Sequence, residues 1–249
     1  MQEAGLRPNV VTYSSVVAAC AGKGRWEEAL QLLTDMQEAG VKPNHFTYNS
    51  AIQACGQEAQ WETALALLAQ MQTAGVAADE VSYSSAIKVC GLAGEWERAV
   101  ALLQKEAAGL PPTMVIFNSA MAACAKNGQW RAAVALLEDA QTRGLQPDLF
   151  SYNSVILAFG NSGRWEEAAE MLQVMLQAGI QPDEVSYNTV IAACGKSSQW
   201  EGAVTFFHEM LERGLSSSRI THSALLAACS TQDQVEQIKQ ILRDVRNAQ

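Results

Sequence analysis

Six tryptophans recur along the chain at an almost constant interval of 35, 35, 34, 35 and 35 residues, and each begins a Trp-x-x-Ala phrase. They are Trp26, Trp61, Trp96, Trp130, Trp165 and Trp200. A fixed period of this size is typical of small helical repeats that bury their apolar faces only by stacking on one another. The 249 residues are therefore expected to form one quasi-linear array rather than separate globular domains.

Each period contains two amphipathic segments. In the first period, Tyr13, Val16, Val17 and Cys20 have the spacing of one face of a helix. After a glycine-containing turn, the apolar residues from Trp26 onward repeat this spacing. Each period therefore predicts a pair of helices.

The end of each period carries residues that terminate helices. Gly40 predicts a left-handed position after the second helix, and Pro43 prevents continuation of that helix. Asn44 can accept a hydrogen bond from the free amides that begin the next helix. The sequence thus predicts an all-α protein built of antiparallel helix pairs.

Periods counted from Val10 give six repeats and two flanking segments. The predicted repeats are residues 10–44, 45–79, 80–113, 114–148, 149–183 and 184–218. Residues 1–9 align with the end of a repeat, so we expect them to be the tail of a preceding repeat in a longer protein. Residues 219–249 are expected to form a divergent helix pair that caps the array. The third repeat is one residue short between Trp96 and Gly109, which predicts an irregular second helix there.

The period and three phrases of sequence resemble the pentatricopeptide repeat family. The phrases are Val-Ser-Tyr-Asn-Thr-Val-Ile (185–191), Trp-Glu-Glu-Ala-Ala-Glu-Met-Leu (165–172) and Gly-Ile-Gln-Pro-Asp (179–183). The tetratricopeptide repeat has a similar architecture, but its period is 34 residues and its first helix usually carries a Gly and a second Tyr that are missing here. The resemblance covers nearly the whole chain. It implies an α-solenoid, a right-handed superhelix of antiparallel helix pairs, that binds single-stranded RNA with one base read by each repeat.

In this family, the residue after the aromatic residue of the first helix and the last residue of the repeat together read the edge of one base. The resemblance assigns this base-reading role to Ser14 with Asn44, Asn49 with Asp79, Ser84 with Thr113, Asn118 with Asp148, Asn153 with Asp183, and Asn188 with Ser218. These small polar side chains offer the defined donors and acceptors that such reading requires. The preferences of the family imply the RNA target A-U-n-U-U-C, in which the third letter is open because Ser84 with Thr113 departs from the usual pairs.

A structural alternative exists for the last residue of each repeat. Asn44, Asp79, Asp148 and Asp183 also suit helix N-caps that need no ligand. Capping does not account for the polar residue that follows the aromatic one. Asn and Ser contribute little to the stability of a helix interior, and this helix is otherwise rich in Ala, Val and Ile.

The second residue of each repeat is apolar although it follows a polar loop. In the family this residue wedges between neighbouring bases, and stacking on aromatic partners is worth about 1 to 3 kcal/mol per base. The resemblance assigns base stacking to Val11, Phe46, Val81, Val115, Phe150 and Val185. The alternative is that these side chains only pack at the N-terminal end of the helix and hold the chain where it enters that helix.

The net charge of −9 opposes binding to phosphate. The first fifteen residues of the repeats, however, are close to neutral, so the acidic excess lies elsewhere in the chain. Their charged residues are four lysines (Lys23, Lys88, Lys126 and Lys196) and three glutamates (Glu58, Glu80 and Glu184). Lys126 and Lys196 hold the position at which the family often contacts phosphate, whereas the other repeats carry Gly22, Gln57, Leu92 and Asn161 there. Few phosphate contacts predict modest affinity and a shallow salt dependence.

The acidic charge leaves a second class of function open. The solenoid could be a structural or adaptor subunit that holds protein subunits of an organellar complex, because extended concave surfaces suit that role. Such a scaffold would be insensitive to changes at the base-reading residues.

Catalysis has little support in the sequence. His45, His208 and His222 occupy unrelated repeat positions, and no catalytic partner recurs near them, so neither an enzyme, a cofactor nor a small-molecule substrate is expected. The cysteines recur at one repeat position without any Cys-x-x-Cys spacing, which predicts reduced, buried packing residues and no metal site. They are Cys20, Cys55, Cys90, Cys124, Cys194 and Cys229.

No apolar run approaches the eighteen or so residues that span a bilayer, so membrane insertion is not expected. The family resemblance implies a mitochondrial or chloroplast location. No targeting segment is visible in this chain, and one would lie upstream of residue 1.

Overall fold

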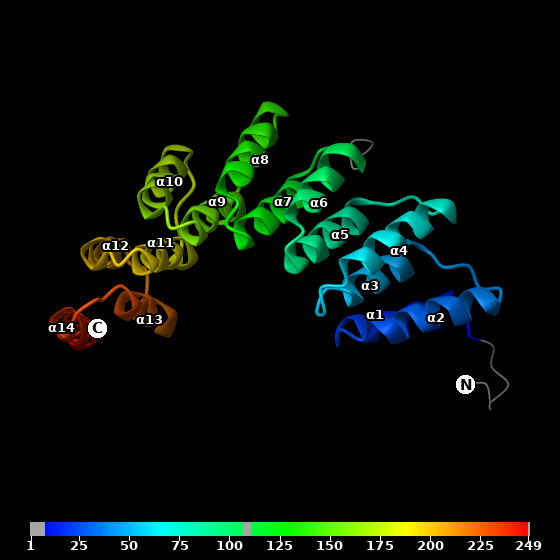
Figure 1. The fold of residues 1–249 in the computed structure, drawn as a ribbon, viewed down its shortest axis with the longest axis horizontal. Helices are drawn as coiled ribbons and strands as arrows, with labels where there is room; N and C mark the ends of the chain where they lie inside the picture. The colour runs from blue at the N-terminus through cyan, green and yellow to red at the C-terminus, as the bar shows by residue number, and fades with distance from the viewer. Residues whose placement is uncertain (1–7, 107–110, 249) are drawn as a thin grey trace. The chain divides into compact units, whose positions relative to one another are not determined.

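The computed structural model describes residues 8–106 and 111–248, and every regular element within these ranges is a helix (Figure 1). The predicted all-α class is confirmed. The elements are α1 (Val10–Ala21), α2 (Trp26–Glu38), α3 (His45–Ala54), α4 (Trp61–Thr73), α5 (Glu80–Ala93), α6 (Trp96–Ala101), the π-helix η2 (Leu102–Glu106), α7 (Met114–Lys126), α8 (Trp130–Thr142), α9 (Leu149–Asn161), α10 (Trp165–Gln177), α11 (Glu184–Lys196), α12 (Trp200–Glu212), α13 (Arg219–Ala227) and α14 (Gln232–Ala248). Of the predicted tail at residues 1–9, only Pro8 and Asn9 lie inside the described ranges.

The chain divides into two compact units, with the boundary inside α7 between Ala123 and Cys124. In the first unit, α1, α3 and α5 lie side by side, and α2, α4 and α6 each pack on the helix that precedes them. Both α2 and α4 also contact the first helix of the following repeat. In the second unit, α9, α11 and α13 form the corresponding row, with α10 and α12 packed on α9 and α11. Each unit is therefore a stack of helix pairs joined by short turns.

The alanine of each Trp-x-x-Ala phrase is completely buried, which explains why a small residue stands there. These residues are Ala29, Ala64, Ala99, Ala133, Ala168 and Ala203. Helices that pack about 8 to 10 Å apart leave little room for a larger side chain at such a point of contact. The aromatic residue of the first helix is among the largest core side chains, and Tyr48, Phe117 and Tyr187 are completely buried.

The helix ends follow the predicted signals. Asn44 accepts a hydrogen bond from the backbone N–H of Thr47 at 3.0 Å and so caps α3. Asn9 caps α1 in the same way through Thr12. Gly40 adopts φ of +73°, a left-handed conformation that favours glycine and ends α2.

Two details depart from the regular pattern. Val16, expected on the buried face of the first helix, is 44% exposed, whereas the equivalent Ala51 is 1% exposed. The reason is that α1 begins the described row of first helices, and α3 covers only one of its sides. In the short third repeat, α6 passes into the π-helical turn η2, which agrees with the predicted irregularity.

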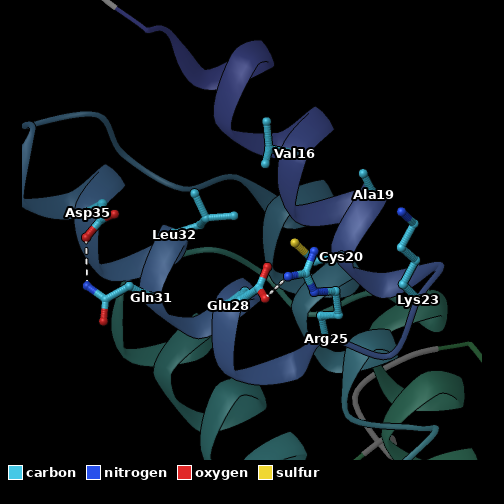
Figure 2. A pocket seen from close by; sticks show the side chains of 9 residues that line it. All are labelled: Val16, Ala19, Cys20, Lys23, Arg25, Glu28, Gln31, Leu32 and Asp35. Carbon is cyan, nitrogen blue, oxygen red and sulfur yellow. Dashed lines mark hydrogen bonds and ion pairs between the residues drawn. The ribbon is translucent and has the colours of Figure 1, made fainter. Parts of the chain in front are cut away.

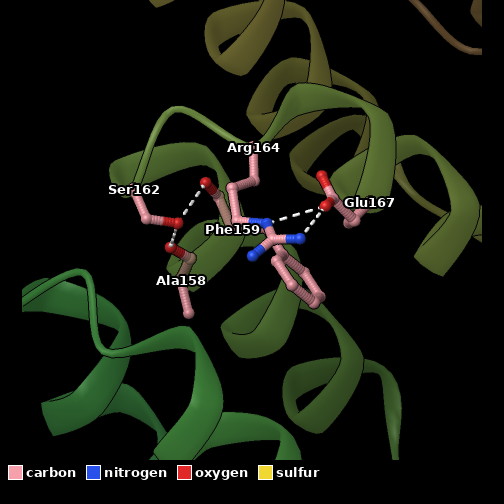
Figure 3. A network of polar contacts seen from close by, with 5 residues as sticks. All are labelled: Ala158, Phe159, Ser162, Arg164 and Glu167. Atoms are coloured by element: carbon pink, nitrogen blue, oxygen red, sulfur yellow. Dashed lines mark hydrogen bonds and ion pairs between the residues drawn. The ribbon is translucent and has the colours of Figure 1, made fainter.

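A polar and aromatic cluster in the repeat at residues 149–183 contacts the preceding repeat in the second unit; Figure 3 shows its residues Ala158, Phe159, Ser162, Arg164 and Glu167. Phe159 occupies the position at which the other repeats carry cysteine, and its ring stacks on Trp130 with centroids 5.5 Å apart. The Arg164 guanidinium lies 4.0 Å from the centre of the same tryptophan ring and donates hydrogen bonds to the Glu167 carboxylate. The Ser162 hydroxyl donates to the backbone carbonyls at the end of α9. Aromatic stacking and a cation–π contact thus stabilise this junction.

Candidate nucleic-acid interface

The structure brings the predicted base-reading residues Asn49 and Asp79 into direct contact. The Asn49 amide nitrogen donates to Asp79 Oδ1 at 3.1 Å, and Asn49 Oδ1 accepts a hydrogen bond from the Ser82 hydroxyl at 2.7 Å. Asp79 also caps α5, because its Oδ1 accepts from the Ser82 backbone N–H at 2.9 Å. Ser82 therefore links the pair of one repeat to the first helix of the next.

The same arrangement recurs in the repeat at residues 149–183. The Asn153 amide donates to Asp183 Oδ1 at 3.3 Å, and the Ser186 hydroxyl donates to Asn153 Oδ1 at 2.6 Å. Ser186 stands in α11 where Ser82 stands in α5. Recurrence in separate compact units indicates that the sequence pattern itself determines this geometry.

The carboxyl group of Asp79 is held in its ionised form. Burial on its own would raise the pKa of Asp79, but hydrogen bonds from the backbone and side chain of Ser82 and from Asn49, together with the charge of His45, lower the pKa below its ordinary value. The Asp79 side chain is thus a fixed hydrogen-bond acceptor at neutral pH.

In the repeat at residues 10–44, the pair is connected through the next helix rather than directly. The buried Ser14 hydroxyl lies 2.7 Å from the Thr47 hydroxyl, which donates to Asn44 Oδ1 at 2.9 Å. Since Thr47 has a single hydroxyl proton, Ser14 is the donor in its contact with Thr47. The Asn44 amide nitrogen donates to no residue within the described ranges.

In the repeat at residues 80–113, both predicted readers are hydrogen-bonded to other groups. The Ser84 hydroxyl donates to the Val81 carbonyl at 3.3 Å. The Thr113 hydroxyl donates to the Glu80 carboxylate. The two hydroxyl protons of this pair are therefore both committed.

The two remaining pairs include further helix caps. Asp148 caps α9 by accepting from the Ser151 N–H at 2.9 Å, and Asn118 is half-buried in α7. Ser218 caps α13 through Thr221. Asn188 Oδ1 is buried and accepts a hydrogen bond from none of the described residues. The predicted capping role is thus confirmed for Asn44, Asp79, Asp148 and Asp183, and Ser218, for which no cap was predicted, also caps a helix.

All six predicted base-stacking residues are exposed, with exposed fractions between 45% and 67%. They are Val11, Phe46, Val81, Val115, Phe150 and Val185. Ile220, which is 70% exposed, holds the equivalent position in α13 and was missed by sequence analysis. Its signal is the spacing of 35 residues from Val185. Large apolar side chains are thus exposed at one recurring repeat position in both compact units.

The row of first helices is hollowed in each compact unit. A hollow of about 250 Å³ in the second unit is lined in part by Val185, Asn188, Lys196 and Ile220, and so combines predicted stacking, reading and phosphate positions. Lys196 donates to Asn161 Oδ1 at 2.5 Å. A hollow of about 560 Å³ lies along α1, α3 and α5 in the first unit. Lys126, the other predicted phosphate contact, is exposed at the end of α7.

Another hollow, of about 420 Å³, is lined by residues of α1, α2 and the turn between them, and none of the predicted readers lines it (Figure 2). It includes Val16 and Leu32 together with an ion pair between Arg25 and Glu28 and a hydrogen bond from Gln31 to Asp35. These four side chains pair with one another, and among the charged lining residues only the Lys23 ammonium bonds to none of the described residues. The hollow therefore lacks the convergent unpaired groups of a ligand site.

The described part of the chain contains no group of three or more His, Cys, Asp or Glu placed to hold a metal ion. The six cysteines form no disulfide, and five of them are buried. None of the described helices is long and apolar enough to cross a membrane.

Comparisons with known proteins agree with this architecture. A family model described as the PPR repeat family matches residues 8–57, 46–91, 112–159, 147–196 and 182–231, and a model described as the PPR repeat matches residues 81–105. A comparison with curated protein sequences gave no match.

Solved structures of helical repeat proteins are also similar. The crystal structure of the pentatricopeptide repeat protein PPR10 from maize is 30% identical, with a TM-score of 0.73 over 98% of this chain and 35% of the PPR10 chain. PPR10 in complex with an 18-nt psaJ RNA element is 28% identical, with a TM-score of 0.58 over 97% of this chain and 39% of that chain. Nuclear proteinaceous RNase P 2 from A. thaliana, at 16% identity and a TM-score of 0.56 over 74% of this chain and 41% of that chain, shares the fold alone. The chain thus spans little more than a third of the length of PPR10.

Proposed function

Because the chain belongs to the pentatricopeptide repeat (PPR) family, we propose that it binds single-stranded RNA with one base read by each repeat. The observation that carries the proposal is the hydrogen-bonded pair of polar side chains found in two separate repeats, Asn49 with Asp79 and Asn153 with Asp183. The RNA-bound structure of PPR10 supports it by family.

The donors and acceptors that remain in the Asn49–Asp79 pair suit uracil. Of the two amide protons of Asn49, one is donated to Asp79 and the other is available. Asp79 Oδ2 accepts from none of the described residues, so the pair offers one donor next to one acceptor. The Watson–Crick edge of uracil offers N3–H between two carbonyl oxygens, which complements this pattern. The Asn153–Asp183 pair offers the same groups.

The pattern in the repeat at residues 10–44 suits adenine instead. The Asn44 amide protons are available, and the Ser14 oxygen, whose proton is donated to Thr47, can accept. Adenine presents the N1 acceptor beside the N6 amino donor. By family resemblance, Asn118 with Asp148 reads uracil and Asn188 with Ser218 reads cytosine, which gives the proposed target A-U-n-U-U-C.

The exposed apolar residues at the second position of the repeats are proposed to separate neighbouring bases, with Lys126 and Lys196 contacting phosphate. By family, we place this activity in organellar RNA metabolism, in a mitochondrion or chloroplast, where RNA binding serves processing, stability or translation. We propose no catalytic activity for the repeats.

The test is a titration of the purified chain with labelled RNA that carries A-U-n-U-U-C, beside a scrambled RNA and the matching DNA, at two salt concentrations. Asn49→Ala and Asn153→Ala should weaken binding to the matched strand by roughly 5- to 100-fold, since a good bidentate base contact contributes about 1 to 3 kcal/mol of discrimination. Glu28→Ala is the control, because Glu28 lies on α2 in an exposed ion pair with Arg25. Equal affinity for matched and scrambled RNA would refute sequence reading.

The net charge of −9 favours a second candidate, a structural or adaptor subunit that holds protein subunits. In that case the chain would bind none of the strands at low salt. Asn49→Ala would then leave partner binding unchanged.

A further inference from the structure

The first residue of a repeat lies beside the base-reading pair of the same repeat. In the repeat at residues 80–113, the Thr113 hydroxyl donates to the carboxylate of Glu80, the first residue of α5. In the repeat at residues 45–79, the charge of the first residue, His45, acts on the last residue, Asp79. A charged first residue can therefore change what a reading pair offers to a base.

The hydrogen bonds of Ser84, Thr113 and Glu80 leave this group with acceptors only. Ser84 and Thr113 have one hydroxyl proton each, and both protons are donated within the protein, to the Val81 carbonyl and to Glu80. An ionised carboxylate has no proton to donate. This repeat therefore presents lone pairs on Thr113 and Glu80, which are in contact, and on Ser84, which stands four residues after Glu80 in α5.

The four bases differ in how many hydrogen-bond donors their Watson–Crick edges can direct at such a group of acceptors. Guanine presents two adjacent donors on its Watson–Crick edge, N1–H and the N2 amino group. Adenine and cytosine each present one amino group next to a ring nitrogen that accepts. Uracil presents one N3–H between two carbonyl oxygens, and a group that contains only acceptors would repel these oxygens.

We propose that the repeat at residues 80–113 reads guanine, and that Glu80 is a specificity-determining residue for this letter. The inference rests on the proposed function, since it concerns the open third letter of the same RNA and completes the target as A-U-G-U-U-C. It gives a role to a residue outside the two reading positions.

The test compares four RNAs that differ only at the third letter of A-U-n-U-U-C, with the scrambled RNA as reference. Guanine should give the tightest binding, by about five- to a hundredfold over uracil, the range expected for one good base contact. Equal affinity for the four RNAs, or tightest binding of another base, would overturn the inference, while the proposed function would stand if all four still bind more tightly than the scrambled RNA. Failure to bind any RNA would overturn the proposed function and this inference with it.

The Glu80→Gln variant tests the role of the carboxylate directly. It keeps the size of the side chain but adds amide donors, so the preference for guanine should fall while the preferences at the other letters persist. Persistence of the guanine preference would overturn the role of Glu80. Comparing the four bases within one variant cancels any general gain in affinity from the lost negative charge.

A matched control stands at the first position of another repeat. The Glu184 carboxylate accepts from the Ser216 hydroxyl at 2.5 Å, two residues before the reader Ser218. Glu184→Gln should therefore leave the base preference at the sixth letter unchanged. The base preference at the sixth letter could instead change as much as Glu80→Gln changes the preference at the third. That result would overturn the inference that the first residue acts through direct contact with the last residue of its repeat.

Discussion

Replacing Gly91 by alanine should force two neighbouring first helices apart. Gly91 is buried in α5, and a Cβ atom added there would lie 2.4 Å from the Cβ of Ala123 and 2.7 Å from its Cα. Carbon atoms in good contact are about 3.5 to 4.0 Å apart, so α5 and α7 must separate by roughly 1 Å. The obstructing atoms belong to a backbone and its Cβ, which have no rotamer that would relieve the overlap.

Two opposing effects set the magnitude. Overpacking of a core costs about 1 to 3 kcal/mol, whereas replacing glycine by alanine inside a helix stabilises by about 0.5 to 1 kcal/mol. The mid-range values of the two effects give an expected loss of about 1 kcal/mol in the free energy of unfolding. Because repeats are stabilised through contacts with their neighbours, the loss should appear as reduced coupling between the third and fourth repeats.

Urea and thermal unfolding followed by circular dichroism would measure this effect in a graded series. At Gly160 the added Cβ would lie 3.0 Å from the Cβ of Ala193, and at Gly22 the nearest atom is 3.7 Å away. Gly91→Ala should therefore lower the unfolding midpoint most, Gly160→Ala less, and Gly22→Ala not at all. A Gly91→Ala protein as stable as the wild type would refute the reasoning.

Three further results are expected. Burial raises the pKa of Cys55 to about 11 and that of Cys124 to about 12, so both thiols should react slowly with a thiol reagent at pH 8. Thiols in the unfolded chain ionise near about pH 8.5. The contribution of the protonated, buried thiols to the free energy of unfolding should therefore be present below about pH 8.5 and be lost as the pH rises through the folded pKa values. A series of urea midpoints measured at increasing pH would show this loss. Phe159→Ala should lower the free energy of unfolding by about 3 to 5 kcal/mol and alter the fluorescence of Trp130, its stacking partner; a loss below about 1 kcal/mol would contradict this. Lys196→Gln should reduce the slope of log affinity for RNA against log salt by about 0.7, and an unchanged slope would argue against a phosphate contact.

The helix pairs and their ends could be predicted from the sequence because local chemistry determines them. Gly40 and Asn44 act within one turn of their own position, as a left-handed glycine and as an N-cap. The exposure of Val11 and Phe46 follows from their place at the start of a helix. Such features need no knowledge of neighbouring repeats.

Contacts between repeats could not be predicted in the same way. The hydrogen bond from Ser82 to Asn49 joins residues 33 positions apart and depends on how closely α3 and α5 pack. The contact of Thr113 with Glu80 also joins residues 33 positions apart in the sequence. Phe159 could have been noticed as a break in the cysteine pattern, but its stacking on Trp130 required the structure.

Capping and base reading are compatible roles for the last residue of a repeat. In Asp79, Oδ1 accepts from the Ser82 N–H and the Asn49 amide, whereas Oδ2 accepts from none of the described residues. One oxygen can therefore hold the helix while the other faces a base. A hydroxyl has a single proton, so the proposed reading chemistry of Thr113 depends on the group that takes this proton. For this reason, the side chain at the first position of a repeat should matter most where the last residue is Ser or Thr.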